Sequence, residues 1–314
     1  MTVYAFVFPG QGSQSVGMGQ DLALAFPAAR AVFEEVDEAL GEHLSKIIFE
    51  GPMDTLTSTE NAQPALMAMS MAVMRVLEQD GGLDLSATAT LLAGHSLGEY
   101  TALAAGRALG VAQTARLLRL RGQAMQKAVP AGEGGMAALI GVTLAQAEEI
   151  CQQAGKTGIV EIANDNGGGQ IVLSGALAGI DAAIALAKEM KIKRAVKLPV
   201  SAPFHSSLMK PAEDVMAEAL AQADIAAPIV PVIANVTAER ETDADTIRRN
   251  LVQQVTGRVR WHESVSAMVG MGVDTFVEIG AGKVLSGLVR RIDPEVSALS
   301  IGTPADIETF LKSL

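Results

Sequence analysis

Residues 94–98 read Gly-His-Ser-Leu-Gly, and they directly follow the apolar run Leu91, Leu92, Ala93. This G-x-S-x-G pattern is typical of a sharp turn between a buried strand and a helix, with the serine lifted above the edge of the sheet. The flanking glycines let the backbone bend that tightly. The following helix would point its first N–H groups at the place where an oxyanion develops. The pattern predicts Ser96 as a nucleophile, although it also occurs by chance in chains rich in Ala and Gly.

Short apolar runs alternate with helical patterns along most of the chain. The runs that predict strands are Val3–Phe8, Leu91–Gly94, Ile229–Ala234 and Asp274–Ile279. The patterns that predict helices are Pro27–Leu40, Gln63–Gln79, Leu97–Ala105, Val111–Lys127, Pro211–Gln222 and Lys283–Arg291. Strands that alternate with helices imply a parallel sheet covered on both faces. We therefore predict an α/β fold with a large α/β-hydrolase-like domain.

The middle of the chain follows a different order, β-α-β-β-α-β. Its predicted strands are Met136–Gly141, Gly158–Ala163, Gln170–Ser174 and Ala195–Val200, and its helices are Leu144–Gln153 and Ile180–Met190. This order is typical of a ferredoxin-like unit. We predict a small ferredoxin-like domain at residues 128–198, inserted into a large domain made of residues 1–127 and 199–314. Because ligands of open α/β sheets bind beyond the carboxyl ends of the strands, the small domain would form the second wall of a cleft.

Composition and charge narrow the class of protein. The net charge is -11 over 314 residues, whereas a nucleic-acid binder usually shows the opposite balance. The single cysteine, Cys151, excludes an internal disulfide and a cysteine metal cluster. The most apolar stretch, Pro64–Val76, is too short to span a bilayer, and the first apolar run has no basic residue before it, unlike a secretory signal. We expect a soluble cytoplasmic protein with no membrane, nucleic-acid or metal partner.

Basic residues gather locally in spite of the acidic total. Five lie within ten residues, namely Lys188, Lys191, Lys193, Arg194 and Lys197, and Arg258 and Arg260 form a smaller group. A basic patch on an acidic protein favours a specific anionic partner. For the lysine cluster alone, a solvated helix face is the simpler interpretation.

Ser96 needs a general base within hydrogen-bond reach, and the chain has four histidines. His95 adjoins the serine, where adjacent side chains point apart, and His43 lies in an amphipathic stretch without a partner group. His262 follows a tryptophan at a predicted helix start and can be structural. His205 lies in the loop that returns the chain from the small domain to the large one. Position alone favours His205 as the base.

Arg121 falls on the apolar stripe of its predicted helix. Its neighbours at helical spacing are all apolar: Leu117, Leu118, Ala124 and Met125. A buried guanidinium keeps its charge and needs an anion or a dense set of acceptors. Two interpretations stay open here, a structural salt bridge to a core carboxylate and a bidentate clamp for a substrate carboxylate.

The loop Pro9–Gln14 follows the first predicted strand and contains Gly10-Gln11-Gly12. Its third glycine is misplaced for the dinucleotide pattern G-x-G-x-x-G, which argues against a nicotinamide oxidoreductase. The alternative is an exposed backbone turn that donates an N–H group to an oxyanion opposite Ser96.

Over essentially the whole chain, several segments resemble those of the malonyl-CoA:acyl carrier protein transacylase family of bacterial type II fatty acid synthesis, and they follow one another in the same order as in that family. They are Phe8-Pro-Gly-Gln-Gly-Ser-Gln14, Gly94-His-Ser-Leu-Gly-Glu-Tyr100, Leu120-Arg-Gly122, Gly135-Met-Ala137, Asn166 with Gly169-Gln170, Phe204-His205, Leu208-Met-Lys-Pro211, Asn235-Val236 and Glu278-Ile-Gly-Ala-Gly-Lys-Val-Leu285. The stretch 256–260 is more basic than expected for the family.

The resemblance implies a role for each matched residue. Ser96 would carry the malonyl ester, His205 would be its base, and Arg121 would bind the malonyl carboxylate. The backbone N–H groups of Gln11 and Leu97 would form the oxyanion hole. The remaining implied site residues are Gln254, whose backbone carbonyl would orient the histidine, Asn166 at the cleft, and Phe204, which would select the acyl group.

The implied reaction is a ping-pong acyl transfer from malonyl-CoA to the phosphopantetheine thiol of an acidic acyl carrier protein, without a cofactor. We consider three alternatives to this functional interpretation. A serine hydrolase such as a thioesterase would use the same sharp turn at residues 94–98, the serine elbow, with water as the acceptor. A non-catalytic module that binds the carrier would keep the fold without needing Ser96, His205 and Arg121. A nicotinamide oxidoreductase is disfavoured by the glycine loop.

Overall fold

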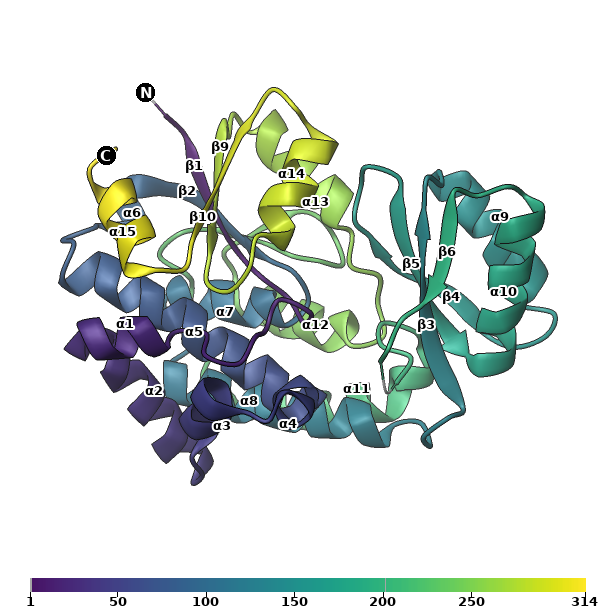
Figure 1. Cartoon of the computed structure of the whole chain (residues 1–314), viewed down its shortest axis with the longest axis horizontal. Coiled ribbons are helices and arrows are strands. Elements are labelled where there is room, and N and C mark those ends of the chain that lie inside the picture. The colour runs from purple at the N-terminus through teal and green to yellow at the C-terminus, as the bar shows by residue number, and fades with distance from the viewer. Residues whose placement is uncertain (1, 201) are drawn as a thin grey trace.

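The computed structural model describes residues 2–200 and 202–314, which form an α/β protein with two separate sheets (Figure 1). The six-stranded sheet has the order β10 (Ser297–Ile301), β9 (Thr275–Ile279), β1 (Tyr4–Phe8), β2 (Ala89–Gly94), β7 (Val232–Ile233) and β8 (Arg240–Glu241). Its strands pair in parallel except β8, which runs antiparallel to β7. The parallel sheet is confirmed, with an antiparallel strand at one edge that the sequence did not predict.

The strand predicted at Ile229–Ala234 is present but shorter than predicted, because only Val232 and Ile233 form β7 and pair with β2. Two prolines, Pro228 and Pro231, lie just before this pair and have no N–H to donate to a ladder. The carbonyl of Pro231 still accepts from the N–H of Leu92. The prolines therefore shorten the strand without detaching it from β2.

Helices cover both faces of the large sheet. The side chains of β1 alternate between the two faces and so contribute to two separate cores. Phe6 and Phe8 point into the larger core, whereas Ala5 and Val7 point into a smaller one. The smaller core is closed by α13 (Trp261–Gly270) and α14 (Val284–Ile292). The larger core is built by α1 (Gln20–Ala25), α2 (Pro27–Leu40), α3 (Leu44–Glu50), α4 (Met53–Thr57), α5 (Thr59–Gln79), α6 (Leu85–Thr88), α7 (Leu97–Ala105), α8 (Val111–Lys127), the 3-10 turn η1 (Ser207–Met209), α11 (Lys210–Ala221), α12 (Ala244–Gln254) and α15 (Pro304–Leu311).

The predicted bounds of α2, α7 and α8 are confirmed residue by residue. Among the residues that the structure describes, no helix combines the length and the apolar character needed to cross a membrane.

The four-stranded sheet lies beside the large one, at the right of Figure 1, and has its own apolar core. Its order is β4 (Val160–Asp165), β5 (Gln170–Ala176), β3 (Gly134–Ile140) and β6 (Arg194–Lys197), with every neighbouring pair antiparallel. The helices α9 (Leu144–Ala154) and α10 (Leu177–Glu189) pack against it. The predicted order β-α-β-β-α-β is the observed order of the elements.

The turn between β2 and α7 is closed by main-chain contact. A methyl group on Gly94 would lie 1.9 Å from the carbonyl of Gly98, and one on Gly98 would lie 2.2 Å from the carbonyl oxygen of Phe8. Between the two glycines, Ser96 adopts a left-handed φ of 54°. The predicted strand–turn–helix around the serine is confirmed, and only glycine fits at its two flanks.

Candidate active site

A cleft of about 390 Å3 lies where the carboxyl ends of β1 and β2 face the small sheet. The large-sheet side contributes the loop 10–14, the elbow and α8, and the small-sheet side contributes Met136, Asn164 and Val172. The predicted site residues that line the cleft are Gln11, Ser96, Leu97, Arg121, Asn166, Phe204 and His205. Gln254 lies behind this wall and reaches the others through hydrogen bonds. The fold thus brings together residues that are far apart in the sequence.

Ser96 and His205 form a hydrogen-bonded pair, with 2.7 Å between the serine Oγ and the histidine Nε2. The other ring nitrogen, Nδ1, lies 2.9 Å from the backbone oxygen of Gln254 and 3.1 Å from that of Gly257. Because carbonyl oxygens only accept, we assign the ring proton to Nδ1. The lone pair of Nε2 then faces the serine hydroxyl, which is the geometry of a nucleophile and its general base.

His205 is 4% exposed, and burial lowers its pKa to about 3, with the charge of Arg121 acting in the same direction. Its imidazole is therefore neutral across the physiological range and is able to accept a proton. Among the described residues, two backbone carbonyls orient the ring and no acidic side chain does so. The carbonyl of Gly257 was not predicted, because a backbone group carries no signal in the sequence.

Arg121 is 1% exposed and is held by neutral oxygens. Its Nη1 donates to the side-chain oxygen of Gln63 over 2.7 Å, and its Nη2 donates to that of Gln254 over 2.8 Å and to the Oγ of Ser96 over 3.1 Å. Its buried Nε has no hydrogen-bond partner among the described residues. Gln63 was missed from the sequence, where it falls within an otherwise apolar helix pattern.

The salt-bridge interpretation of Arg121 is wrong, because none of the ion pairs between described residues includes it. A buried guanidinium whose hydrogen bonds go only to neutral acceptors keeps its charge available to an anion in the cleft. The arrangement fits the second interpretation, a clamp for a substrate carboxylate beside Ser96.

The groups predicted to form the oxyanion hole lie on the large-sheet side of the cleft, beside Ser96. Leu97 is the first residue of α7, so its N–H has no partner within the helix. The N–H of Ser96 itself donates to the side chain of Asn235 over 2.7 Å. The side-chain oxygen of Gln11 accepts from Thr59 over 2.8 Å, which holds the glycine loop against α5. The N–H groups of Gln11 and Leu97 remain the predicted pair of donors.

The other histidines are placed away from the serine hydroxyl. His95 is half-buried and its Nε2 lies 2.9 Å from the Oδ1 of Asn166, so the predicted cleft asparagine holds this ring. The side chain of His43 is 89% exposed, and that of His262 lies 3.7 Å from Asp165. His205 is the histidine that reaches Ser96.

The structure also places two remaining features of the sequence, Phe204 and the basic stretch 256–260. Phe204 is buried in the cleft wall immediately before His205. Arg258 and Arg260 both pair with Glu263, so the basic stretch noted in the sequence is partly neutralised within the chain. Among the described residues, no group of three or more His, Cys, Asp and Glu side chains could hold a metal ion.

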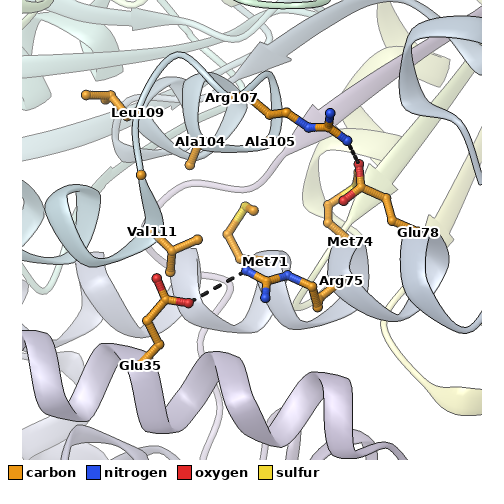
Figure 2. Close-up of a pocket in the computed structure, with 11 residues that line it drawn as sticks. Glu35, Met71, Met74, Arg75, Glu78, Ala104, Ala105, Arg107, Leu109 and Val111 are labelled. Carbon is orange, nitrogen blue, oxygen red and sulfur yellow. Dashed lines mark hydrogen bonds and ion pairs between the residues drawn. The ribbon is translucent and has the colours of Figure 1, made fainter. Parts of the chain in front are cut away.

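A second hollow, of about 340 Å3, lies among α2, α5 and the segment that joins α7 to α8 (Figure 2). Its charged side chains pair with one another, Arg75 with Glu35 and Arg107 with Glu78. None of the described residues that line it is a serine, cysteine or histidine. Its charges are compensated within the hollow, so it offers no free charge among the described residues that line it.

The fold and the site together define an α/β protein with an elbow serine, a histidine bonded to that serine and a buried arginine beside both. A family model described as the acyl transferase domain matches residues 5–297. The chain belongs to the acyl transferase domain family.

Its relatives share nearly the full length. The chain is 44% identical over 315 residues to the malonyl CoA-acyl carrier protein transacylase of Bacillus subtilis (strain 168), covering 100% of this chain and 98% of that protein. It matches the crystal structure of an acyl-carrier-protein-S-malonyltransferase from Bartonella henselae with a TM-score of 0.98 at 56% identity, covering 99% of both chains. A malonyl-transacylase solved in complex with its type II PKS acyl-carrier protein matches with a TM-score of 0.96 at 40% identity, covering 100% of both chains.

Proposed function

We propose that this chain transfers a malonyl group from malonyl-CoA to the phosphopantetheine thiol of an acyl carrier protein, through a malonyl ester on Ser96. The observation that carries the proposal is the hydrogen-bonded pair of Ser96 and His205 beside Arg121, a buried cation that forms no ion pair with the described carboxylates. The family match and the names of the full-length relatives support it.

The first half of the reaction loads the serine. The guanidinium of Arg121 binds the free carboxylate of the malonyl group and so places its thioester carbon near the Oγ of Ser96. His205 Nε2 takes the hydroxyl proton as the new C–O bond forms, and the N–H groups of Gln11 and Leu97 stabilise the oxyanion. The tetrahedral intermediate then breaks its C–S bond, and His205 returns the proton to the sulfur of CoA.

The second half repeats these steps in reverse with a new thiol. The phosphopantetheine thiol gives its proton to His205 and attacks the ester carbonyl in the same oxyanion hole. The C–O bond to Ser96 breaks, and the serine recovers its proton from His205. Arg121 holds the carboxylate throughout, so the acyl group keeps its position while the two thiols exchange.

We also propose a division of the chain that serves this chemistry. Residues 1–127 and 199–314 form a large α/β-hydrolase-like domain, and residues 128–198 form a ferredoxin-like domain that closes one side of the cleft. The order β4-β5-β3-β6 supports the second description, and α8 and β6 end next to the proposed boundaries. A cytoplasmic location remains a prediction.

A mass spectrum taken after brief exposure to malonyl-CoA tests the proposed function. We expect one malonyl group on Ser96 and its loss when a phosphopantetheine-bearing carrier protein is added. Absence of the adduct from folded protein would refute the transferase mechanism. Sustained release of CoA without any thiol acceptor would instead identify a hydrolase, because water would then be discharging the ester.

The pH profile of acylation is expected to stay level between pH 8 and about 5. A histidine with the ordinary pKa of about 6.5 would lose half of its base form at pH 6.5. The folded-state pKa of His205 is about 3, so its neutral form persists down to pH 5 and is lost only as the pH approaches 3. The measurement is kcat/KM for CoA release from acetyl-CoA, which has no free carboxylate. An inflection near pH 6.5 would show that the base titrates as an ordinary histidine.

A further inference from the structure

Behind the cleft lies a buried carboxyl group that the proposed reaction does not use. Glu99, on the first turn of α7, is 1% exposed. Its Oε2 accepts from the backbone N–H of Asn235 over 2.9 Å and from the side-chain Nε2 of Gln254 over 2.8 Å. None of the ion pairs between described residues includes it. Burial of a carboxyl group is costly, so its retention calls for a structural or functional reason.

The amide of Gln254 connects this carboxyl group to the arginine. Its Oε1 accepts from Arg121 Nη2 over 2.8 Å, and its Nε2 donates to Glu99 and, over 3.0 Å, to the backbone oxygen of Ser96. A guanidinium only donates, and a carboxylate and a carbonyl only accept. One orientation of the amide therefore satisfies all three neighbours, and the flipped orientation would set donor against donor and acceptor against acceptor.

We propose that Glu99 is a positioning residue for acyl selectivity, which locks the amide of Gln254 and thereby holds the guanidinium of Arg121 beside Ser96. The inference rests on the proposed function, because the selectivity concerned is that for an acyl group with a free carboxylate. Glu99 touches neither the serine hydroxyl nor His205 in the hydrogen-bond network.

The orientation of the Gln254 amide determines where the guanidinium of Arg121 lies. A rotated Gln254 would leave Arg121 Nη2 without its shorter hydrogen bond, and the remaining acceptor of that nitrogen would be the Ser96 Oγ itself. The guanidinium would then move to find another acceptor, because an unsatisfied buried donor is costly. Burial raises the pKa of Glu99 to about 7, partly offset by the hydrogen bonds from Asn235 and Gln254.

The test compares kcat/KM for malonyl-CoA with kcat/KM for acetyl-CoA in the wild type, Glu99→Met and Glu99→Gln. Glu99→Met removes the acceptor oxygens, and we expect it to lower the malonyl-to-acetyl ratio by about tenfold. Glu99→Gln keeps one acceptor oxygen for Gln254, and we expect its ratio to stay within about threefold of the wild type. An unchanged ratio in Glu99→Met, or equal loss in both variants, would overturn the proposal.

A second variant keeps the test decisive if Glu99→Met fails to fold, as judged by its thermal melting. Gln254→Met removes the bridge but retains the backbone carbonyl that faces His205. We expect its malonyl kcat/KM to fall about tenfold further than its acetyl kcat/KM, and equal losses would overturn the proposal. The comparison uses wild-type protein that forms the malonyl adduct, so a failed lock and a failed function give different results.

Discussion

Replacing Ser96 with alanine is expected to lower malonyl transfer by about 10^6-fold and to abolish the malonyl adduct. The hydroxyl is the protein group that bonds to the acyl carbon in the proposed mechanism, and removal of a serine nucleophile elsewhere costs an effect of this order. The residual rate would come from the oxyanion hole and from substrate binding. Steady-state transfer to the carrier protein and mass spectrometry of the intact protein measure the two effects.

Ser207→Ala is the matched control for this variant. Ser207 is exposed and lies two residues after His205, so its loss should leave both the rate and the adduct within about twofold of the wild type. Both variants should melt close to the wild-type temperature. An adduct that persists in Ser96→Ala would place the nucleophile elsewhere and would contradict the mechanism.

Arg121→Ala is expected to lower kcat/KM for malonyl-CoA by about a hundredfold to a thousandfold and that for acetyl-CoA by far less. Truncation of one partner in a buried charged hydrogen bond costs about 2 to 5 kcal/mol, and acetyl has no carboxylate to lose. The malonyl-CoA kcat/KM of Arg121→Lys should lie between those of the wild type and Arg121→Ala, because an ammonium keeps the charge but not the planar fork of hydrogen-bond donors. The measurement is the kcat/KM of both substrates in each variant.

Arg116→Ala serves as the control, since Arg116 lies on the same helix with its side chain exposed. Its malonyl-to-acetyl ratio should equal that of the wild type. Equal losses for malonyl and acetyl in Arg121→Ala would assign the arginine a structural role and remove it from acyl recognition.

The sequence predicted the parts of the site that local patterns encode. The glycines around Ser96 fixed the elbow, and helical periodicity alone placed Arg121 on the buried face of α8. His205 was favoured by its place between two predicted domains, and its distance to Ser96 required the structure. These features depend on spacing along the chain, which periodicity reveals.

Contacts between distant segments could not be predicted in the same way. The carbonyl of Gly257, the side chain of Gln63 and the carboxyl group of Glu99 all act across folded segments, and the local sequence around each does not reveal its partner. The strands β8 and β10 were also missed. The first has only two residues, and the second is an edge strand with a partly exposed pattern, so neither presents the buried run that identified β1.

The elbow has a consequence for how this site can change. Gly94, Gly98 and the carbonyl of Phe8 hold the turn around the serine by main-chain contact, and side-chain hydrogen bonds with Asn235 and Gln254 add to it. The proposed acyl clamp is held by side chains instead, through Gln63 and Gln254. Among the described residues, Gln63 bonds to Arg121, Thr59 and Met125 and not to the serine. Substitutions at Gln63 can therefore alter which acyl group is accepted while the nucleophile stays in place, which makes it the natural target for redesigning this chain toward other acyl donors.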